Sequence, residues 1–380
     1  MTMIAFAVPI LDGKLEDWKH MILDTMHGDN KQSTDQSREN AGVHERSYLQ
    51  KMESGHACIL TWEGEHPLPF WLDLMDVALP EFTEILAGLY QKQKTINPKY
   101  FYDTHGSELF ERITSLPEYY PTRTERALYE QHANSIAEYC GQNCVLIEPG
   151  SGSSEKVRLL LGAIKPAAYV PMDIAKDFLH RSALKLGQEF PWLNVHAVCA
   201  DFGQYDQAPE GLPDGKRVIF YPGSTLGNMT PDVAKQFLQQ LRQWVGGNGG
   251  MLVGIDLHKP TDRVTAAYND GEGVTAEFNL NALNNINRLT NSNFDVNNFS
   301  HRAFYNEDLR RIEMHLESNI DHIVRVGDST IVFAEGETIH TENSYKYTLQ
   351  SFRSLAESAG FNVCQSWLDD EQLFSVHYLE

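Results

Sequence analysis

The hydrophobic positions of the chain after residue 80 follow two alternating periods. Short apolar runs of strand character are separated by segments whose apolar residues recur at helical spacing. The predicted strands cover residues 168–172, 195–199, 217–221 and 251–256, and the predicted helices cover residues 122–140, 176–187 and 231–245. Later β character falls at residues 311–318, 330–334 and 373–379, with a helix at residues 348–359. Strands that alternate with helices predict an α/β fold built on a doubly wound parallel sheet.

The first 80 residues have a different order of elements. A strand at residues 4–10 is followed by helical spacing over residues 14–27. Two candidate strands at residues 45–52 and 56–62 then precede a helix at residues 67–79. This order predicts a small α+β domain of ferredoxin-like type.

Charge and composition exclude several classes of partner. The chain of 380 residues has 31 Lys+Arg and 52 Asp+Glu, a net charge of −21, so neither nucleic acid nor a membrane surface is an expected partner. A hydrophobic content of 42% is sufficient for a large core, and no apolar run reaches the length of a membrane span. The five cysteines are scattered and odd in number, which favours reduced thiols, the cytoplasm and no metal site.

A glycine-rich turn carries the strongest local signal. The segment LIEPGSGSSEK contains Gly150, Gly152 and Lys156 between a predicted strand and a predicted helix. Such a turn lets a ligand approach the backbone closely at a helix N-terminus. The third glycine of the dinucleotide fingerprint is absent, which favours S-adenosylmethionine over nicotinamide or flavin cofactors. A plain tight turn is the alternative.

Polar residues also follow the next three predicted strands. Asp173 can accept hydrogen bonds from ribose hydroxyls or can cap the following helix. Asp201 and Phe202 can contact an adenine ring or form a surface turn. The loop from Gly223 to Asn228 has no lysine of the phosphate-binding type, so it favours a small substrate.

Several longer segments together resemble one family. LIEPGSGSSEK, YVPMDI, DF and GSTLGN occur in order, after KYFYDTHGSELFERITSLPEYYPTRTE and before AAYNDGEGVTAEFN, RIEMHL and EGETIHTENSYKY. Residues 81–380 thereby resemble the L-histidine Nα-methyltransferases of the ergothioneine pathway, which make hercynine from histidine and S-adenosylmethionine. Residues 1–80 lie outside the resemblance. Pro149, where the family usually has leucine, is a modest departure that removes a backbone donor.

The resemblance implies a set of site residues. The cofactor site would consist of Tyr102, Phe110, Gly150, Gly152, Lys156, Asp173, Asp201 and Phe202. The amino and carboxylate groups of the substrate would be held by Tyr119, Gly223, Thr225, Asn228 and Tyr268, of which Tyr119, Asn228 and Tyr268 would be catalytic. Glu342 and Ser344 would bind the imidazole between Phe278 and Met314. Glu342 and Ser344 alternate along a β-like segment, so both side chains should point to one face.

The resemblance also implies how the chain is divided. It predicts a Rossmann-like class I methyltransferase sheet with an inserted α+β substrate-binding domain, after the small N-terminal domain at residues 1–80. The substrate-binding domain would cover residues 81–121 and 259–347, and the S-adenosylmethionine-binding domain would cover residues 122–258 and 348–380.

The expected reaction is an in-line methyl transfer to the neutral α-amine of L-histidine, continued to the trimethylated betaine. The sulfonium group is already an activated leaving group, so alignment of the reactants is the main requirement. One alternative is a methyltransferase of the same family acting on tryptophan or tyrosine. A sensor of S-adenosylmethionine or an amino acid without turnover is another. Residues 1–80 could form a homodimer interface or have no such role.

Overall fold

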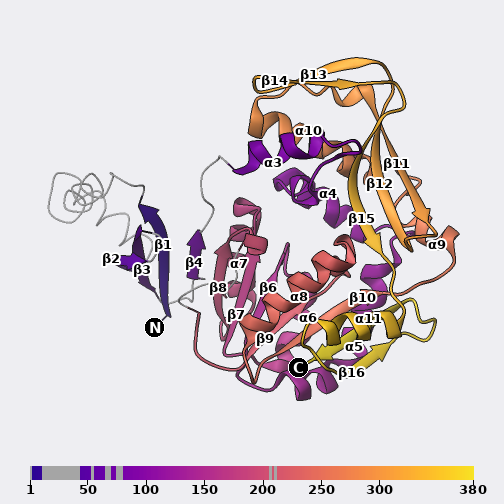
Figure 1. Cartoon of the computed structure of the whole chain (residues 1–380). Helices are drawn as coiled ribbons and strands as arrows, with labels where there is room; N and C mark the ends of the chain where they lie inside the picture. The colour runs from indigo at the N-terminus through magenta and orange to yellow at the C-terminus, as the bar shows by residue number, and fades with distance from the viewer. Residues whose placement is uncertain are drawn as a thin grey trace, which may run out of the picture.

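A large mixed sheet forms the centre of the molecule (Figure 1). The computed structural model describes residues 2–10, 43–52, 55–64, 70–73, 80–204, 208 and 212–380. The strands of the eleven-stranded sheet are, in spatial order, β16 (Val363–Leu368), β17 (Phe374–Leu379), β10 (Gly250–Asp256), β9 (Arg217–Tyr221), β6 (Val145–Pro149), β7 (Ala168–Asp173), β8 (Asn194–Cys199), β4 (Phe70–Asp73), β1 (Thr2–Ile10), β3 (Gly55–Gly64) and β2 (Val43–Met52).

The middle of this sheet is doubly wound, as the sequence predicts. Strands β8, β7, β6, β9 and β10 are parallel to their neighbours, whereas β17 runs antiparallel to β10. The chain moves outward from β6 through β7 to β8 and then returns to the other side of β6 with β9. Ligands bind at the carboxyl ends of the strands where such an order reverses. The point between β6 and β9 is therefore the expected place for a site.

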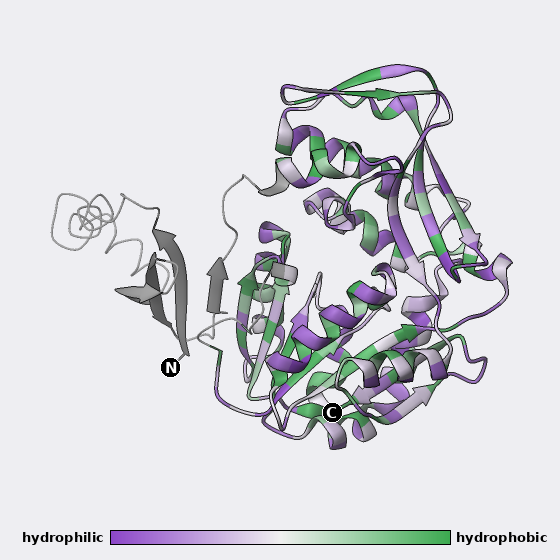
Figure 2. Ribbon diagram, in the orientation of Figure 1, coloured by the Kyte–Doolittle hydropathy of each residue, from purple (hydrophilic) through white to green (hydrophobic). Residues whose placement is uncertain are grey.

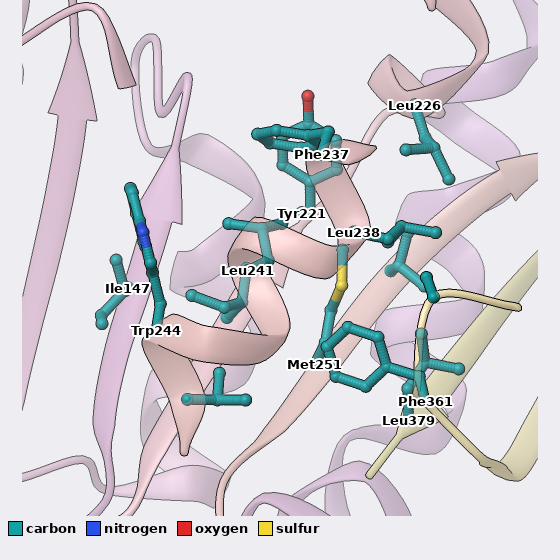
Figure 3. Packing of buried hydrophobic residues seen from close by; sticks show 14 of the residues in the cluster. Ile147, Tyr221, Leu226, Phe237, Leu238, Leu241, Trp244, Met251, Phe361 and Leu379 are labelled. Atoms are coloured by element: carbon teal, nitrogen blue, oxygen red, sulfur yellow. The ribbon is translucent and has the colours of Figure 1, made fainter. Parts of the chain in front are cut away.

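Two layers of helices cover the two faces of the sheet. On one face lie α8 (Pro231–Val245) and α11 (Leu349–Ser358); on the other lie α5 (Tyr120–Cys140), α6 (Glu155–Ile164) and α7 (Lys176–Glu189). Ile147 of β6 faces the first layer and Leu146 faces the second, as the alternation of a strand requires. Figure 2 shows apolar residues along the central strands, and Figure 3 shows Phe237 of α8 beside Tyr221 of β9.

A second, four-stranded sheet lies at the carboxyl ends of the large one. Its order is β11 (Phe299–Asn306), β12 (Arg311–Ser318), β15 (Thr338–Tyr345) and β5 (Lys94–Thr95), with a separate hairpin of β13 (His322–Val326) and β14 (Ser329–Phe333). The surrounding helices are α3 (Pro80–Leu89), η1 (Pro98–Phe101), α4 (Thr104–Thr114), α9 (Thr261–Ala266) and α10 (Val274–Thr290). Strand β15 approaches η3 (Thr225–Asn228), which follows β9, so closely that a Cβ added at Gly227 would lie 2.8 Å from the carbonyl oxygen of Tyr345.

Most predicted elements after residue 80 are confirmed within two residues at each end, but the N-terminal region differs from the prediction. Strands β1, β2 and β3 are present, whereas residues 70–73, predicted as part of a helix, form strand β4 and pair with β8. An apolar run of this length fits a strand as well as a helix. The predicted helix at residues 14–27 lies outside the described residues, so the ferredoxin-like domain stays a prediction. Among the helices that the structure describes, none is both long and apolar enough to cross a membrane.

Candidate active site

The glycine-rich loop between β6 and α6 is held against the end of β7. Gly150 and Gly152 have φ angles of +70° and +52°, which glycine adopts without the strain of a side chain. The backbone N–H groups of Gly150 and Ser151 donate to the carbonyl of Met172 at 2.8 and 2.9 Å. The ring of Phe202 lies 3.7 Å from the position of a Cβ at Gly150. The loop and Phe202 therefore lie next to each other.

Asp173 uses its carboxylate to hold this loop. One oxygen accepts from the backbone N–H of Gly152 at 2.9 Å, and the other accepts from the N–H of Ala175, at the start of α7, at 2.9 Å. Burial raises the pKa of Asp173, although these backbone donors act in the opposite direction. The N-cap residue of α7 is Ala175 and no side chain caps this helix, so Asp173 contacts the N-cap residue without being the cap that the sequence offered as an alternative. Each carboxylate oxygen has more than one acceptor site, so the contact leaves room for a ribose hydroxyl.

Buried polar groups lie beneath the glycine loop. Within the described part of the chain, Ser151 Oγ is buried and has no hydrogen-bond partner. Nearby, the Tyr169 hydroxyl donates to Glu148 and lies 2.9 Å from Ser154 Oγ. Burial raises the pKa of Glu148 to about 8, against the opposing contact with Tyr169. An unsatisfied hydroxyl beside a glycine loop fits a polar cofactor that would supply its partner.

Glu125 joins the cofactor loop to the candidate substrate loop. This carboxylate of α5 is fully buried and accepts from Lys156 Nζ at 2.6 Å, from the Tyr129 hydroxyl at 2.8 Å and from the backbone N–H of Gly223 at 2.9 and 3.0 Å. Lys156 Nζ lies 3.0 Å from the position of a Cβ at Gly223. Lys156, predicted as a cofactor residue, is therefore paired with Glu125 and bridges the two loops.

A wall of aromatic rings closes one side of the site. Tyr102, at the end of η1, contacts Phe110 of α4 and Phe278 of α10, with ring centroids 5.8 and 5.5 Å apart. Tyr119 lies between Phe110 at 6.3 Å and Tyr268 at 6.2 Å. Burial, followed by the nearby Tyr268 and Glu342, raises the pKa of Tyr119 well above its ordinary value. Rings predicted for the cofactor site and for the substrate site thus belong to one cluster.

A β-bulge determines which side chains of β15 face this wall. Met314 pairs with Glu342 while the next residue, His315, pairs with His340, so Thr341 is the extra residue. Glu342 and His340 therefore point to opposite faces, although a simple alternation would place them together. On the site face, Asn228 Nδ2 donates to Glu342 at 2.9 Å. Burial raises the pKa of Glu342 to about 8, and Lys346 acts to lower it.

An ionic cluster supports the other end of the site. Lys346 and Lys259 both pair with the buried Asp256 at the end of β10. Burial acts to raise the pKa of Asp256, but the two ammonium groups hold it below its ordinary value. Lys346 also donates to Ser344 Oγ at 2.7 Å, and Ser344 Oγ lies 2.7 Å from the Tyr268 hydroxyl. Ser344 and Tyr268, both predicted substrate residues, are therefore joined to a cluster that the sequence did not reveal.

The opposite face of β15 carries a group with metal-ligand chemistry. Potential ligand atoms of Glu313, His315 and His340 all lie within 4.8 Å of one another. One oxygen of Glu313 accepts from Arg311 at 2.7 and 2.9 Å, and the other lies 3.0 Å from His315 Nε2. The two histidine rings stack 10° from parallel, so their in-plane lone pairs do not converge. This group fits a hydrogen-bonded ion cluster better than a metal site.

Other predicted residues occupy positions beside these groups. Lys99 of η1 pairs with Asp201 at 3.2 Å, and the Thr225 hydroxyl donates to the carbonyl of Pro222 at 3.0 Å. Met314 is buried opposite Glu342. Sequence reasoning missed Glu125 and Lys346, although both lie in segments that carried the family resemblance. Asp256 could have been found from its place at the end of a strand.

Comparisons with known proteins identify the family of this chain. A family model described as histidine-specific, S-adenosylmethionine-dependent methyltransferase matches residues 82–380. A histidine N-alpha-methyltransferase of Mycobacterium tuberculosis is 39% identical over 300 residues, which cover 77% of this chain and 92% of that protein. Ergothioneine biosynthesis protein 1 of Neurospora crassa is 31% identical over 73% of this chain and 32% of its own length. An L-tryptophan methyltransferase of Psilocybe serbica is 27% identical over 77% of this chain and 90% of its own length. The predicted resemblance is confirmed, and the chain belongs to the family of histidine-specific, S-adenosylmethionine-dependent methyltransferases.

Proposed function

We propose that this chain methylates the α-amino nitrogen of L-histidine and continues to the trimethylated betaine, hercynine, a step of ergothioneine biosynthesis. The observation that carries the proposal is the pair of Glu342 and Ser344 on the site face of β15. One offers a carboxylate and the other a hydroxyl, at the end of an aromatic wall. A neutral imidazole has one N–H donor and one acceptor nitrogen, so it complements this pair.

The cofactor would bind at the glycine loop. We assign its contacts to Gly150, Gly152, Asp173, Asp201 and Phe202, with Tyr102, Phe110 and Lys156 on the side of the substrate. The unpartnered Ser151 Oγ, an orphan among the described residues, supports this place. S-adenosylmethionine supplies a methyl carbon that is activated by the positive charge of its sulfur.

The substrate would lie between the aromatic wall and β15. Phe278 and Met314 would flank its ring, and Gly223, Thr225, Asn228, Tyr119 and Tyr268 would surround the amino and carboxylate groups. Alignment of the amine with the methyl group would supply up to roughly 7–11 kcal/mol of the barrier reduction. The methyl groups added to nitrogen leave the imidazole contacts unchanged, which would favour successive transfers.

The proton of the α-amine would leave to water. Tyr119 and Tyr268 are the hydroxyls that we assign to the surroundings of the amine, but burial raises the pKa of both above the ordinary value. Both remain protonated near neutral pH, so they position the amine and do not act as strong bases.

The division of the chain that the sequence predicts is also part of the proposal. Residues 81–121 and 259–347 would form the substrate-binding domain, and residues 122–258 and 348–380 would form a class I methyltransferase domain. Cys140 and Cys144 are buried free thiols, which supports a reducing compartment such as the cytoplasm.

Mass spectrometry of products from histidine tests the proposal directly. We expect mono-, di- and trimethylhistidine, and their absence would refute it. Glu342→Ala should lower kcat/KM for histidine by roughly 5–150-fold, because an imidazole N–H left without its partner in a buried site costs about 1–3 kcal/mol. Glu317→Ala is the matched control, since Glu317 lies in the same sheet and pairs with Arg302 near the surface. Preferred turnover of tryptophan would favour the alternative suggested by the Psilocybe relative.

A further inference from the structure

Lys346 occupies a position from which it can control two substrate-facing hydroxyls. Its side chain is fully buried. Its ammonium nitrogen lies 2.7 Å from an oxygen of Asp256, 2.7 Å from Ser344 Oγ and 3.2 Å from the Tyr268 hydroxyl. An ammonium group has three N–H donors and no acceptor, so these three contacts use all of its capacity.

The donors of Lys346 restrict the directions of the neighbouring hydrogen bonds. Ser344 Oγ and the Tyr268 oxygen must both accept from the ammonium group. These two oxygens lie 2.7 Å apart, so one hydroxyl hydrogen lies between them. The remaining hydroxyl hydrogen must point away from the trio of Lys346, Ser344 and Tyr268. The Ser344–Tyr268 pair therefore presents a hydrogen-bond donor to the site, whichever of the two side chains carries it.

We propose that Lys346 is a positioning residue that makes the Ser344–Tyr268 pair a donor for the unprotonated ring nitrogen of the substrate. Glu342, on the same face, accepts from the N–H of the ring. The two contacts together select a ring with one N–H and one lone pair, which is a neutral imidazole. This inference rests on the proposed function, because it concerns how that site recognises histidine.

The charges around Lys346 support this role. Asp256 neutralises the ammonium group within the core, and Lys259 occupies the other oxygen of Asp256. The titratable groups that interact electrostatically with Lys346 or Tyr268 from the surrounding elements include Asp256, Lys259, Glu342, Tyr102, Tyr119, Tyr120 and Tyr305. Lys259 instead donates to the Tyr120 hydroxyl at 2.8 Å and pairs with Asp256. It is therefore a matched control, because it belongs to the same ionic cluster.

The test compares histidine with 3-(pyrrol-2-yl)alanine, whose ring keeps an N–H but has no acceptor nitrogen. We measure kcat/KM for both and form the ratio of histidine to the analogue. The full-length protein should favour histidine by at least about 100-fold, because a buried donor is left unpaired with the analogue. In Lys346→Met the ratio should fall by at least tenfold, since the hydroxyls can then turn away from the ligand. In Lys259→Met the ratio should stay within about threefold of the original.

Two outcomes would overturn the inference. The ratio can remain unchanged in Lys346→Met, or it can fall equally in Lys259→Met. If Lys346→Met does not fold, Lys346→Gln replaces it with the same expected tenfold fall, because the amide oxygen can accept from the hydroxyls. Failure of the unaltered protein to methylate histidine would instead refute the proposed function, and this inference with it.

Discussion

Replacing Glu125 by alanine should weaken both the fold and the substrate loop. The buried carboxylate has three partners: Lys156, the Tyr129 hydroxyl and the backbone N–H of Gly223. Lys156 is partly exposed and can regain water, whereas the Tyr129 hydroxyl is fully buried and would lose its partner. An unsatisfied buried donor costs about 1–3 kcal/mol, and the lost contact to Gly223 adds about 1 kcal/mol.

We therefore expect Glu125→Ala to lower the free energy of unfolding by about 2–4 kcal/mol in urea titrations. The KM for histidine should also rise, because Gly223 loses its anchor. Glu130→Ala is the control, since Glu130 lies on the same helix in an exposed pair with Arg126, worth about 0.5 kcal/mol or less. Equal destabilisation by the two substitutions, or an unchanged KM in Glu125→Ala, would refute the reasoning.

Three further predictions concern other parts of the molecule. Because the pKa of Glu148 is raised to about 8, the folded state keeps a proton that the unfolded state loses, so stability should fall as pH rises from 4.5 to 8. Glu148→Gln should reduce this fall by several kcal/mol, since one pKa unit corresponds to about 1.4 kcal/mol; an unchanged pH profile would contradict it. Gly227→Ala should destabilise the protein by about 1–3 kcal/mol through contact with the Tyr345 carbonyl, whereas Gly162→Ala, with no described atom within 4 Å, should stabilise its helix by up to about 1 kcal/mol. If residues 1–80 form a dimer interface, light scattering should give a molar mass twice the 43.1 kDa of one chain. Deletion of these residues should then convert the dimer to a monomer, and an unchanged oligomeric state after the deletion would exclude this interface.

The helices and strands that the sequence predicts well are those with simple apolar patterns. The strands of the doubly wound sheet are buried on both faces and read as apolar runs. Helix α10 was not predicted, because its buried face includes Asn279, Asn281 and Asn285. Their amides donate to the carbonyl of His315, to Asp103 and to the carbonyl of Tyr100. Polar residues that are buried through such contacts hide the helical period.

The residues of the candidate site also differ in whether a local sequence pattern could reveal them. Gly150, Asp173 and Asn228 were found because they follow predicted strands, and parallel strands bring their carboxyl ends to one edge. Glu125 and Lys346 were not, because contacts that tie them to the site, to Gly223 and to Asp256, join segments far apart in the sequence. Lys346 meets Asp256 only where the two sheets join, 90 residues apart by number. No local pattern specifies such a pairing before the topology is known.

The join between the two sheets determines what separating them would cost. The chain leaves the large sheet after β10 and returns to it after β15, and these two segments lie side by side. His258 N–H donates to the Tyr347 carbonyl at 2.8 Å, and Tyr347 N–H donates to the Asp256 carbonyl at 3.1 Å. Pulling the segments apart would also break the buried pair of Lys346 and Asp256, at about 3–5 kcal/mol. The second sheet is therefore tied to the large one by backbone hydrogen bonds and a buried ion pair at the same place, so separating the two sheets there means breaking all of these contacts together.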